Sequence, residues 1–155
     1  NYSPKSIYPL LNMMQGAVDS GTGRIVRRMG FKHPAGGKTG TTNNFKDAWF
    51  NGFTKTMSTA VWVGYDNNKP MINRFKHGLT GASAAAPIWA FFMEKALKGK
   101  NEIKFPIPEG IKFEKVDVHS GTFVDDQSLE SINVALKEEV VVLSRDLKSN
   151  DNSKE

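Results

Sequence analysis

The sequence predicts an α+β fold in which an antiparallel sheet packs against helices. Apolar residues recur at helical spacing within residues 6–18 and again within 87–97. Between these two segments, from residue 37 to residue 65, three β-prone runs are joined by short polar links. Short links join antiparallel neighbours, so we expect the three strands to pair in chain order.

Composition limits the possibilities before any motif is considered. A chain of 155 residues with 39% hydrophobic and 24% charged residues has the length and balance of one ordinary soluble globular domain. It contains no run of about 18 apolar residues and opens on no signal-peptide pattern, so the chain as given is expected neither to span nor to target a membrane. The absence of cysteine excludes disulfides and thiol chemistry.

The net charge of +5 is unevenly distributed along the chain. Residues 1–100 carry 14 Lys and Arg against 4 Asp and Glu, whereas residues 101–155 carry 7 against 12. The simpler interpretation of this uneven distribution is that most of the charges lie on a solvated surface. The more specific interpretation is that residues 1–100 face an anionic partner. Nucleic acid is not expected, because the aromatic residues of the strands alternate with apolar neighbours, which indicates a core more than a base-stacking platform.

The first helix is predicted over residues 6–18. Its apolar face repeats at spacings of three, four and seven residues and consists of Ile7, Leu10, Leu11, Met14 and Val18. Ser3 and Pro4 are suitable helix-start residues, and the glycines at 21 and 23 favour an end.

The three strands are predicted to begin near Gly37, near Phe45 and near Thr59. Asparagines in the link at 42–44 tolerate the backbone angles of a turn, and the polar link at 54–58 reads as a hairpin. The first strand is therefore expected to be the outer member of the sheet, with one edge free.

The last helix is predicted from Pro87 to about Gly99, with an apolar stripe made of Trp89, Phe92, Met93, Ala96 and Leu97. We expect Trp62 of the third strand to share the core with Trp89, Phe92 and Met93. Residues 101–147 are expected to form a trailing extended segment, and residues 148–155 have the composition of a disordered polar tail.

One heptapeptide, residues 36–42 with the sequence GGKTGTT, contains the residues best suited to bind a ligand. It is not a phosphate-binding loop, because such a loop requires a glycine where Lys32 stands, and it precedes a strand instead of a helix. On a strand, Lys38 can attract a carboxylate while the hydroxyls of Thr39 and Thr41 donate to it. Gly40 permits close approach of another backbone, so an extended peptide could add to the free edge.

The flanks of this heptapeptide extend the pattern. In order, they read AGGKTGTT at 35–42, DAWFNGFT at 47–54, VWVGYD at 61–66, GLTG at 78–81 and AAPIW at 85–89. The combination closely resembles the end of the transpeptidase domain of class A, bifunctional penicillin-binding proteins, over roughly residues 5–98, and so implies a β-lactamase-like fold.

The resemblance implies a function in peptidoglycan cross-linking. Lys38, Thr39, Gly40 and Thr41 would bind the terminal D-alanyl carboxylate of the stem peptide or of a β-lactam. The backbone N–H of Thr41 would form one arm of the oxyanion hole. The resemblance implies no cofactor and no metal, and an extracytoplasmic location for a parent protein that is membrane-anchored upstream.

Two parts of the family pattern are missing. No serine is followed by lysine three positions later, and the match to Ser-x-Asn, Ser131-Ile132-Asn133, lies after the Lys-Thr-Gly strand instead of before it. We treat this match as a coincidence. Residues 1–100 are thus expected to be the C-terminal portion of a serine-type D-Ala-D-Ala transpeptidase, inactive without the upstream portion that carries the nucleophile.

A second hypothesis remains open. A non-catalytic basic module could bind an anionic cell-wall polymer or nucleic acid through the charge excess of residues 1–100. Other enzyme classes find no support, because His33, His77 and His119 lack metal-ligand spacing.

Overall fold

The computed structural model describes residues 2–124 and 131–141. The chain divides into two compact units. Residues 14–105 form the first, here called the sheet unit, and residues 1–13 with 106–155 form the second, the hairpin unit. The polar tail expected at 148–155 lies outside the described residues. The division of the chain expected at residues 100 and 147 stays a prediction.

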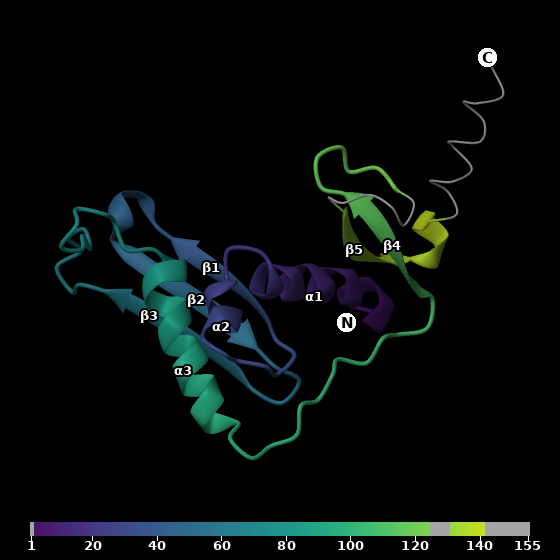
Figure 1. The fold of residues 1–155 in the computed structure, drawn as a ribbon, viewed down its shortest axis with the longest axis horizontal. Coiled ribbons are helices and arrows are strands. Elements are labelled where there is room, and N and C mark those ends of the chain that lie inside the picture. The colour runs from purple at the N-terminus through teal and green to yellow at the C-terminus, as the bar shows by residue number, and fades with distance from the viewer. Residues whose placement is uncertain (1, 125–130, 142–155) are drawn as a thin grey trace. The chain divides into compact units, whose positions relative to one another are not determined.

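The sheet unit is built on three antiparallel strands in chain order, as predicted. They are β1 (Gly36–Thr41), β2 (Asp47–Phe53) and β3 (Ser58–Gly64). β1 lies at one edge of the sheet and β3 at the other (Figure 1). A short 3-10 segment, Asn43–Phe45, joins β1 to β2, with Asn44 at a φ of 61°, a backbone angle that asparagine tolerates.

Side chains alternate between the two faces of this sheet. One face buries Ala48 and Phe50 completely and turns toward the helices. The other face carries Lys38, Trp49 and Asn51, which are all exposed. The register places Lys38 opposite Asn51, so the lysine projects from the open face.

Two helices and a π-helical segment cover the buried face (Figure 1). They are α2 (Ile25–Arg28), η2 (Gly81–Ala85) and α3 (Ala86–Ala96). The ring of Trp89 lies at the centre of the core, 5.3 Å from both Phe31 and Phe50 between centroids. Its Nε1 donates to the carbonyl of Thr59 at 3.1 Å, which satisfies the one polar atom of the ring. The core positions predicted for Trp89 and Met93 are confirmed, since neither is accessible.

The core positions predicted for Trp62 and Phe92 are wrong. Trp62 is 43% exposed because it stands opposite Trp49 on the open face of the sheet. Phe92 is 48% exposed because the buried stripe of α3 runs along Ala86, Trp89, Ala90, Met93 and Leu97. At 100° per residue, Phe92 falls outside that stripe.

The first helix, α1 (Pro4–Asp19), extends the predicted range by two residues at the start and one at the end. Along its expected apolar face only Val18 is fully buried, while Ile7 and Leu10 are 46% and 59% exposed. The short helix α2 was not predicted; it follows the glycines that indicated the end of α1.

The hairpin unit contains β4 (Ile111–Asp117) paired antiparallel with β5 (Ser131–Lys137). Both strands fall in the segment expected to be merely extended, and their pairing was not predicted. The unit also holds the start of α1, where the Asn12 amide oxygen accepts from the N–H of Ala135 at 3.0 Å. Among the residues that the structure describes, no helix combines the length and apolarity needed to cross a membrane.

Candidate functional site

The free edge of β1 brings the predicted site residues together on one strand. Lys38 is exposed, and its Nζ donates to the carbonyl oxygen of Thr39 at 2.7 Å. Within residues 2–124 and 131–141, Lys38 has no carboxylate partner. Its charge is therefore not neutralised by the described part of the chain.

The hydrogen-bond pattern of the sheet decides which backbone groups of β1 face outward. The N–H of Thr42 donates to the carbonyl of Asp47 at 3.1 Å, one step beyond the register pair Thr41 and Ala48. Hydrogen-bonded and non-hydrogen-bonded pairs alternate along an antiparallel ladder. It follows that the backbone N–H groups of Thr39 and Thr41 point away from β2, toward the free edge.

The hydroxyl of Thr41 is fixed by a hydrogen bond from the backbone of Gly81. Its Oγ1 accepts a hydrogen bond from the N–H of Gly81 at 3.0 Å. A hydroxyl that accepts one hydrogen bond still has its own proton to donate. The contact fixes the oxygen and leaves the proton of Thr41 available to a ligand.

Gly81 can make this contact because it has no side chain. A Cβ at this position would lie 2.2 Å from the carbonyl oxygen of Trp49 and 2.6 Å from that of Gly40. Thr80 and Ser83, which flank Gly81 in the sequence, form a reciprocal capping box between their side chains and backbones that starts η2. Sequence reasoning missed this support for Thr41, although Thr80 and Ser83 have the spacing of a capping box.

The hydroxyl of Thr39 is paired with a second hydroxyl. Its Oγ1 lies 3.0 Å from the Oγ1 of Thr22, and either oxygen can be the donor. Thr22 belongs to the glycine-containing segment between α1 and α2, so this segment supports β1 as well as ending α1.

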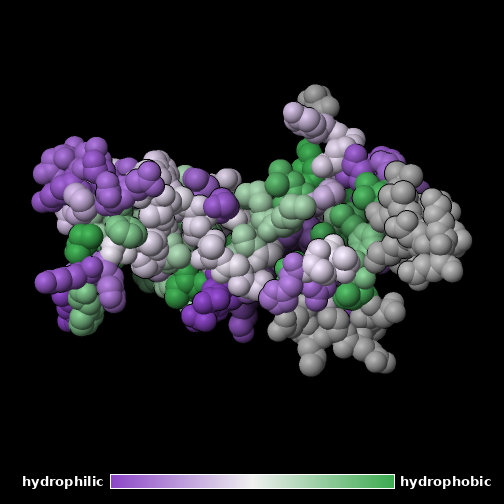
Figure 2. Space-filling model, turned by 90° about the horizontal axis from the view of Figure 1, so that it is seen from above, coloured by the Kyte–Doolittle hydropathy of each residue, from purple (hydrophilic) through white to green (hydrophobic). Residues whose placement is uncertain are grey.

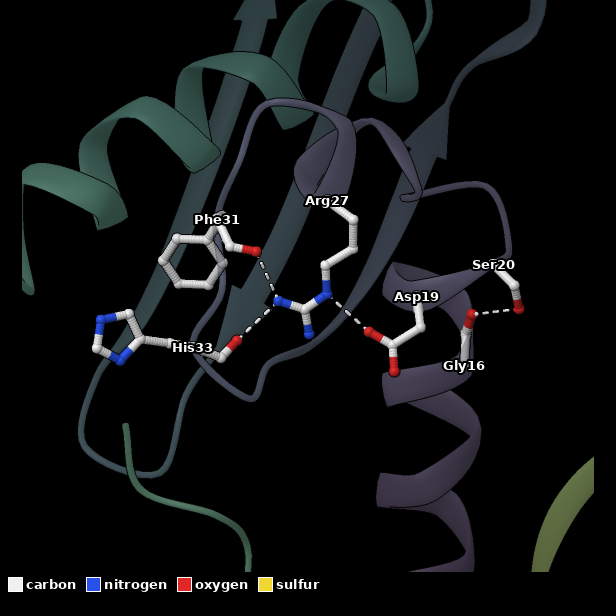
Figure 3. A network of polar contacts seen from close by, with 6 residues as sticks. All are labelled: Gly16, Asp19, Ser20, Arg27, Phe31 and His33. Atoms are coloured by element: carbon white, nitrogen blue, oxygen red, sulfur yellow. Dashed lines mark hydrogen bonds and ion pairs between the residues drawn. The ribbon is translucent and has the colours of Figure 1, made fainter. Parts of the chain in front are cut away.

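Arg27 fixes the approach of the chain to β1 (Figure 3). Its Nε donates to the carboxylate of Asp19 at 2.7 Å, and one terminal nitrogen donates to the carbonyls of Phe31 and His33 at 2.9 and 2.8 Å. A planar guanidinium with several donors suits such a junction. Arg27 thereby ties the end of α1 to the loop that leads into β1, a role that sequence reasoning did not assign.

Other polar residues lie away from the free edge of β1. Asp47 accepts from the ring N–H of Trp62 at 2.9 Å and from the hydroxyl of Thr42 at 3.1 Å, so it stabilises the turn between β1 and β2. Ser131 and Asn133 lie on β5 in the hairpin unit. In the described part of the chain, no three histidine or acidic side chains gather where they could hold a metal ion.

Comparisons with known proteins agree on one family. The chain is 39% identical over 116 residues to penicillin-binding protein 1A of Rickettsia conorii, and 42% identical over 108 residues to penicillin-binding protein 1A of Neisseria meningitidis. These matches cover 75% and 70% of this chain but only 14% and 13% of the relatives. The chain thus spans about a seventh of the length of these curated proteins. No protein-family model matches it.

The solved structures that resemble this chain are penicillin-binding proteins as well. Penicillin-binding protein 1A from Haemophilus influenzae superposes with a TM-score of 0.71 and 28% identity, covering 88% of this chain and 20% of its own. PonA1 from Mycobacterium tuberculosis, in complex with penicillin V, superposes with a TM-score of 0.52 and 30% identity over 64% of this chain and 27% of its own. The arrangement of helices and antiparallel strands is therefore that of a penicillin-binding transpeptidase domain.

Proposed function

Because the chain belongs to the class A penicillin-binding proteins, as part of their transpeptidase domain, we propose that it forms the substrate-binding portion of a serine-type DD-transpeptidase. In this proposal the enzyme cross-links peptidoglycan stem peptides and is acylated by β-lactams. The observation that carries it is the free edge of β1, where an unneutralised lysine lies beside outward-facing backbone N–H groups.

Each residue of the edge has a role in this proposal. Lys38 supplies the positive potential for the terminal carboxylate, and the hydroxyls of Thr39 and Thr41 donate to it. Gly40 lets the peptide backbone come close to the strand, because it carries no side chain. The N–H of Thr41 forms one arm of the oxyanion hole, where removal of a single donor slows acyl transfer by about 100- to 1000-fold in well-studied enzymes.

The nucleophile belongs to an upstream portion of the same domain. This chain contains no Ser-x-x-Lys, so it has no base-activated serine of the kind the chemistry requires. We expect the chain by itself to be inactive as an acyltransferase. The parent protein is proposed to act outside the cytoplasm, where its stem-peptide substrate lies, and to be anchored upstream.

A labelled penicillin tests the proposal directly. Intact-mass spectrometry follows covalent label on this chain alone and on the chain joined to its upstream portion. We expect label on the joined protein only. Label on neither would contradict the proposal and favour the alternative of a basic binding module.

Variants of β1 test the assigned roles in the joined protein. Lys38→Ala removes charge-assisted bonds, so acylation is expected to fall about 10- to 100-fold. Thr41→Pro deletes the outward N–H and is expected to be slower still. Thr41→Ala keeps the N–H and loses a hydroxyl, so its effect is expected to be about five-fold, near 1 kcal/mol.

The matched control for these variants is Lys55→Ala. Lys55 is an exposed lysine in the β2–β3 link, away from the middle of β1, and its removal is expected to leave acylation unchanged. If Thr41→Pro folded and reacted at the normal rate, the oxyanion role of Thr41 would be ruled out.

A further inference from the structure

A cavity of about 730 Å³ lies in the sheet unit next to the support of β1. Its walls come from the end of α1, from α2 and from the junction of η2 with α3, and include Thr22, Arg24, Ile25, Arg28 and Pro87. Its volume is in the range of small-ligand sites. None of these residues belongs to the β1 motif, so the cavity is a separate set of side chains.

Two guanidinium groups of this cavity have no partner among the residues that the structure describes. Arg24 and Arg28 are four positions apart and so lie on the same side of the short helix. Across the described residues, neither guanidinium group makes a hydrogen bond or an ion pair, whereas the guanidinium of Arg27 between them makes three hydrogen bonds. The carboxylate of Asp19, which lies close in sequence, is already taken by Arg27. Residues 2–124 and 131–141 therefore leave these two positive charges of the cavity uncompensated.

The remaining lining defines the chemistry of a ligand. The hydroxyl of Thr22 can donate to an anion, while Ile25 and Pro87 provide apolar wall. The hydroxyls of Ser20 and Ser83 donate within the chain, to the carbonyls of Gly16 at 3.3 Å and Thr80 at 3.4 Å. Guanidinium groups bind carboxylates in a forked geometry that lysine cannot provide. We propose that this cavity binds the carboxylate of a small, partly apolar anion, of which the C-terminal end of a peptide is the fitting chemical class.

The cavity is connected to β1 through a pair of hydroxyls. Thr22 lines the cavity, and its Oγ1 lies 3.0 Å from the Oγ1 of Thr39. The two hydroxyls have two protons, and one of them makes their mutual bond. The other proton faces either the cavity or the edge of β1. A ligand that accepts from Thr22 thus draws the proton of Thr39 away from β1, a consequence that rests on the proposed function.

The test uses the joined, domain-length protein with δ1-¹³C-labelled isoleucine, in which the methyl group of Ile25 reports on the cavity wall. The probes are N-acetyl-D-alanine and its C-terminal amide, which differ only in the charge of the carboxyl end. We expect the acid to shift the Ile25 signal with an affinity at least about ten-fold higher than that of the amide.

Three variants separate the cavity from β1. Arg24→Gln with Arg28→Gln is expected to abolish the preference for the acid, and both side chains are exposed, so the fold tolerates the change. Lys98→Gln with Lys100→Gln removes two charges at the opposite end of α3 and is expected to change nothing. Lys38→Gln is expected to leave the Ile25 response intact.

Several results of these experiments would overturn the inference. No shift of Ile25, equal binding of acid and amide, or a preference that survives the double arginine variant would overturn the inference. Loss of the Ile25 response in Lys38→Gln would also overturn it, since the signal would then originate at β1. Failure of the proposed transpeptidase role would be seen separately, as absence of penicillin label with the cavity still binding the acid.

Discussion

At the scale of single residues, the absence of a side chain at Gly81 allows its backbone N–H to reach the Thr41 hydroxyl on β1. Gly81→Ala would place a Cβ within 2.6 Å of two backbone oxygens, which cannot move aside as a flexible side chain can. We expect η2 to shift away from β1 and to break the hydrogen bond between Gly81 and Thr41. Penicillin acylation of the joined protein is expected to fall by up to about five-fold, the loss expected for Thr41→Ala, because the Thr41 hydroxyl loses its support.

Gly16→Ala is the matched control for this substitution. A Cβ at Gly16 would meet no atom within 4 Å, and the residue lies inside α1. The change is expected to raise the free energy of unfolding by up to about 1 kcal/mol through helix propensity, without affecting acylation. Urea denaturation and the acylation rate are measured on both variants. Equal changes in Gly81→Ala and Gly16→Ala would contradict the role given to Gly81.

A residue-scale pH dependence is expected in the turn that follows β4. The backbone N–H of Ser120, the N–H of His119 and the Ser120 hydroxyl all donate to Asp117 and lower the pKa of its carboxyl group. A pKa that is lower in the folded state gives stability that is present above the unfolded value of about 3.9 and is lost as pH falls through the folded value. The turn is therefore expected to loosen only below about pH 4.

An NMR titration of the Ser120 and His119 amides would check this dependence. Asp117→Asn is expected to remove the acid transition from both signals. Glu109→Gln, which removes an exposed carboxylate of the same unit away from the turn, is expected to leave it in place. An identical transition in Asp117→Asn would assign the effect to another group.

At the scale of elements, the stability of the sheet unit depends on which face of α3 is buried. Trp89 is inaccessible between two phenylalanine rings, so Trp89→Ala is expected to cost about 3 to 5 kcal/mol. Phe92 on the same helix is 48% exposed, so Phe92→Ala is expected to cost less than about 1 kcal/mol. Urea denaturation of the joined protein measures both, and equal costs would contradict the observed orientation of α3.

The sequence alone predicts the elements with strong periodicity, but it does not predict which face of each element is buried. The three strands and their order follow from β-prone runs and short polar links, and α3 follows from its stripe and Pro87. The face of Trp62 could not be read from alternation alone, because aromatic residues stand on both sides of the sheet. The single turn α2 lies below the length at which periodicity is informative.

The candidate site was predictable to a similar degree. Lys38, Thr39, Gly40 and Thr41 share one short motif, so the sequence alone placed them on a free strand edge. Two of their supports, Thr22 and Gly81, lie 17 and 40 positions away from Thr39 and Thr41, and no local pattern links them to β1. Long-range contacts of this kind depend on how the helices pack on the sheet, which periodicity does not specify.

At the scale of the whole molecule, large apolar side chains reach the surface among hydrophilic ones (Figure 2). In the sheet unit they include Trp49 and Trp62 on the open face of the sheet, 40% and 43% exposed, with ring centroids 6.3 Å apart. An exposed aromatic pair beside an unpaired strand edge is typical of a surface that another part of the protein covers. Under the proposed function, this part is the upstream portion that carries the nucleophile.

Because the chain contains no cysteine, a single introduced thiol can report whether that face is covered. Ala60 is exposed on the open face, opposite Asn51, and Ala60→Cys is expected to react freely with a maleimide in the chain alone. In a joined protein whose upstream cysteines have been replaced, the reaction is expected to be at least about ten-fold slower, since local opening must precede it. Lys55→Cys in the β2–β3 link provides the control and is expected to react at the same rate in both forms. Peptide mass spectrometry at timed intervals gives the reaction rates in both forms. If joining the upstream portion slowed the reactions of Ala60→Cys and Lys55→Cys by the same factor, the upstream portion would not cover the open face of this sheet.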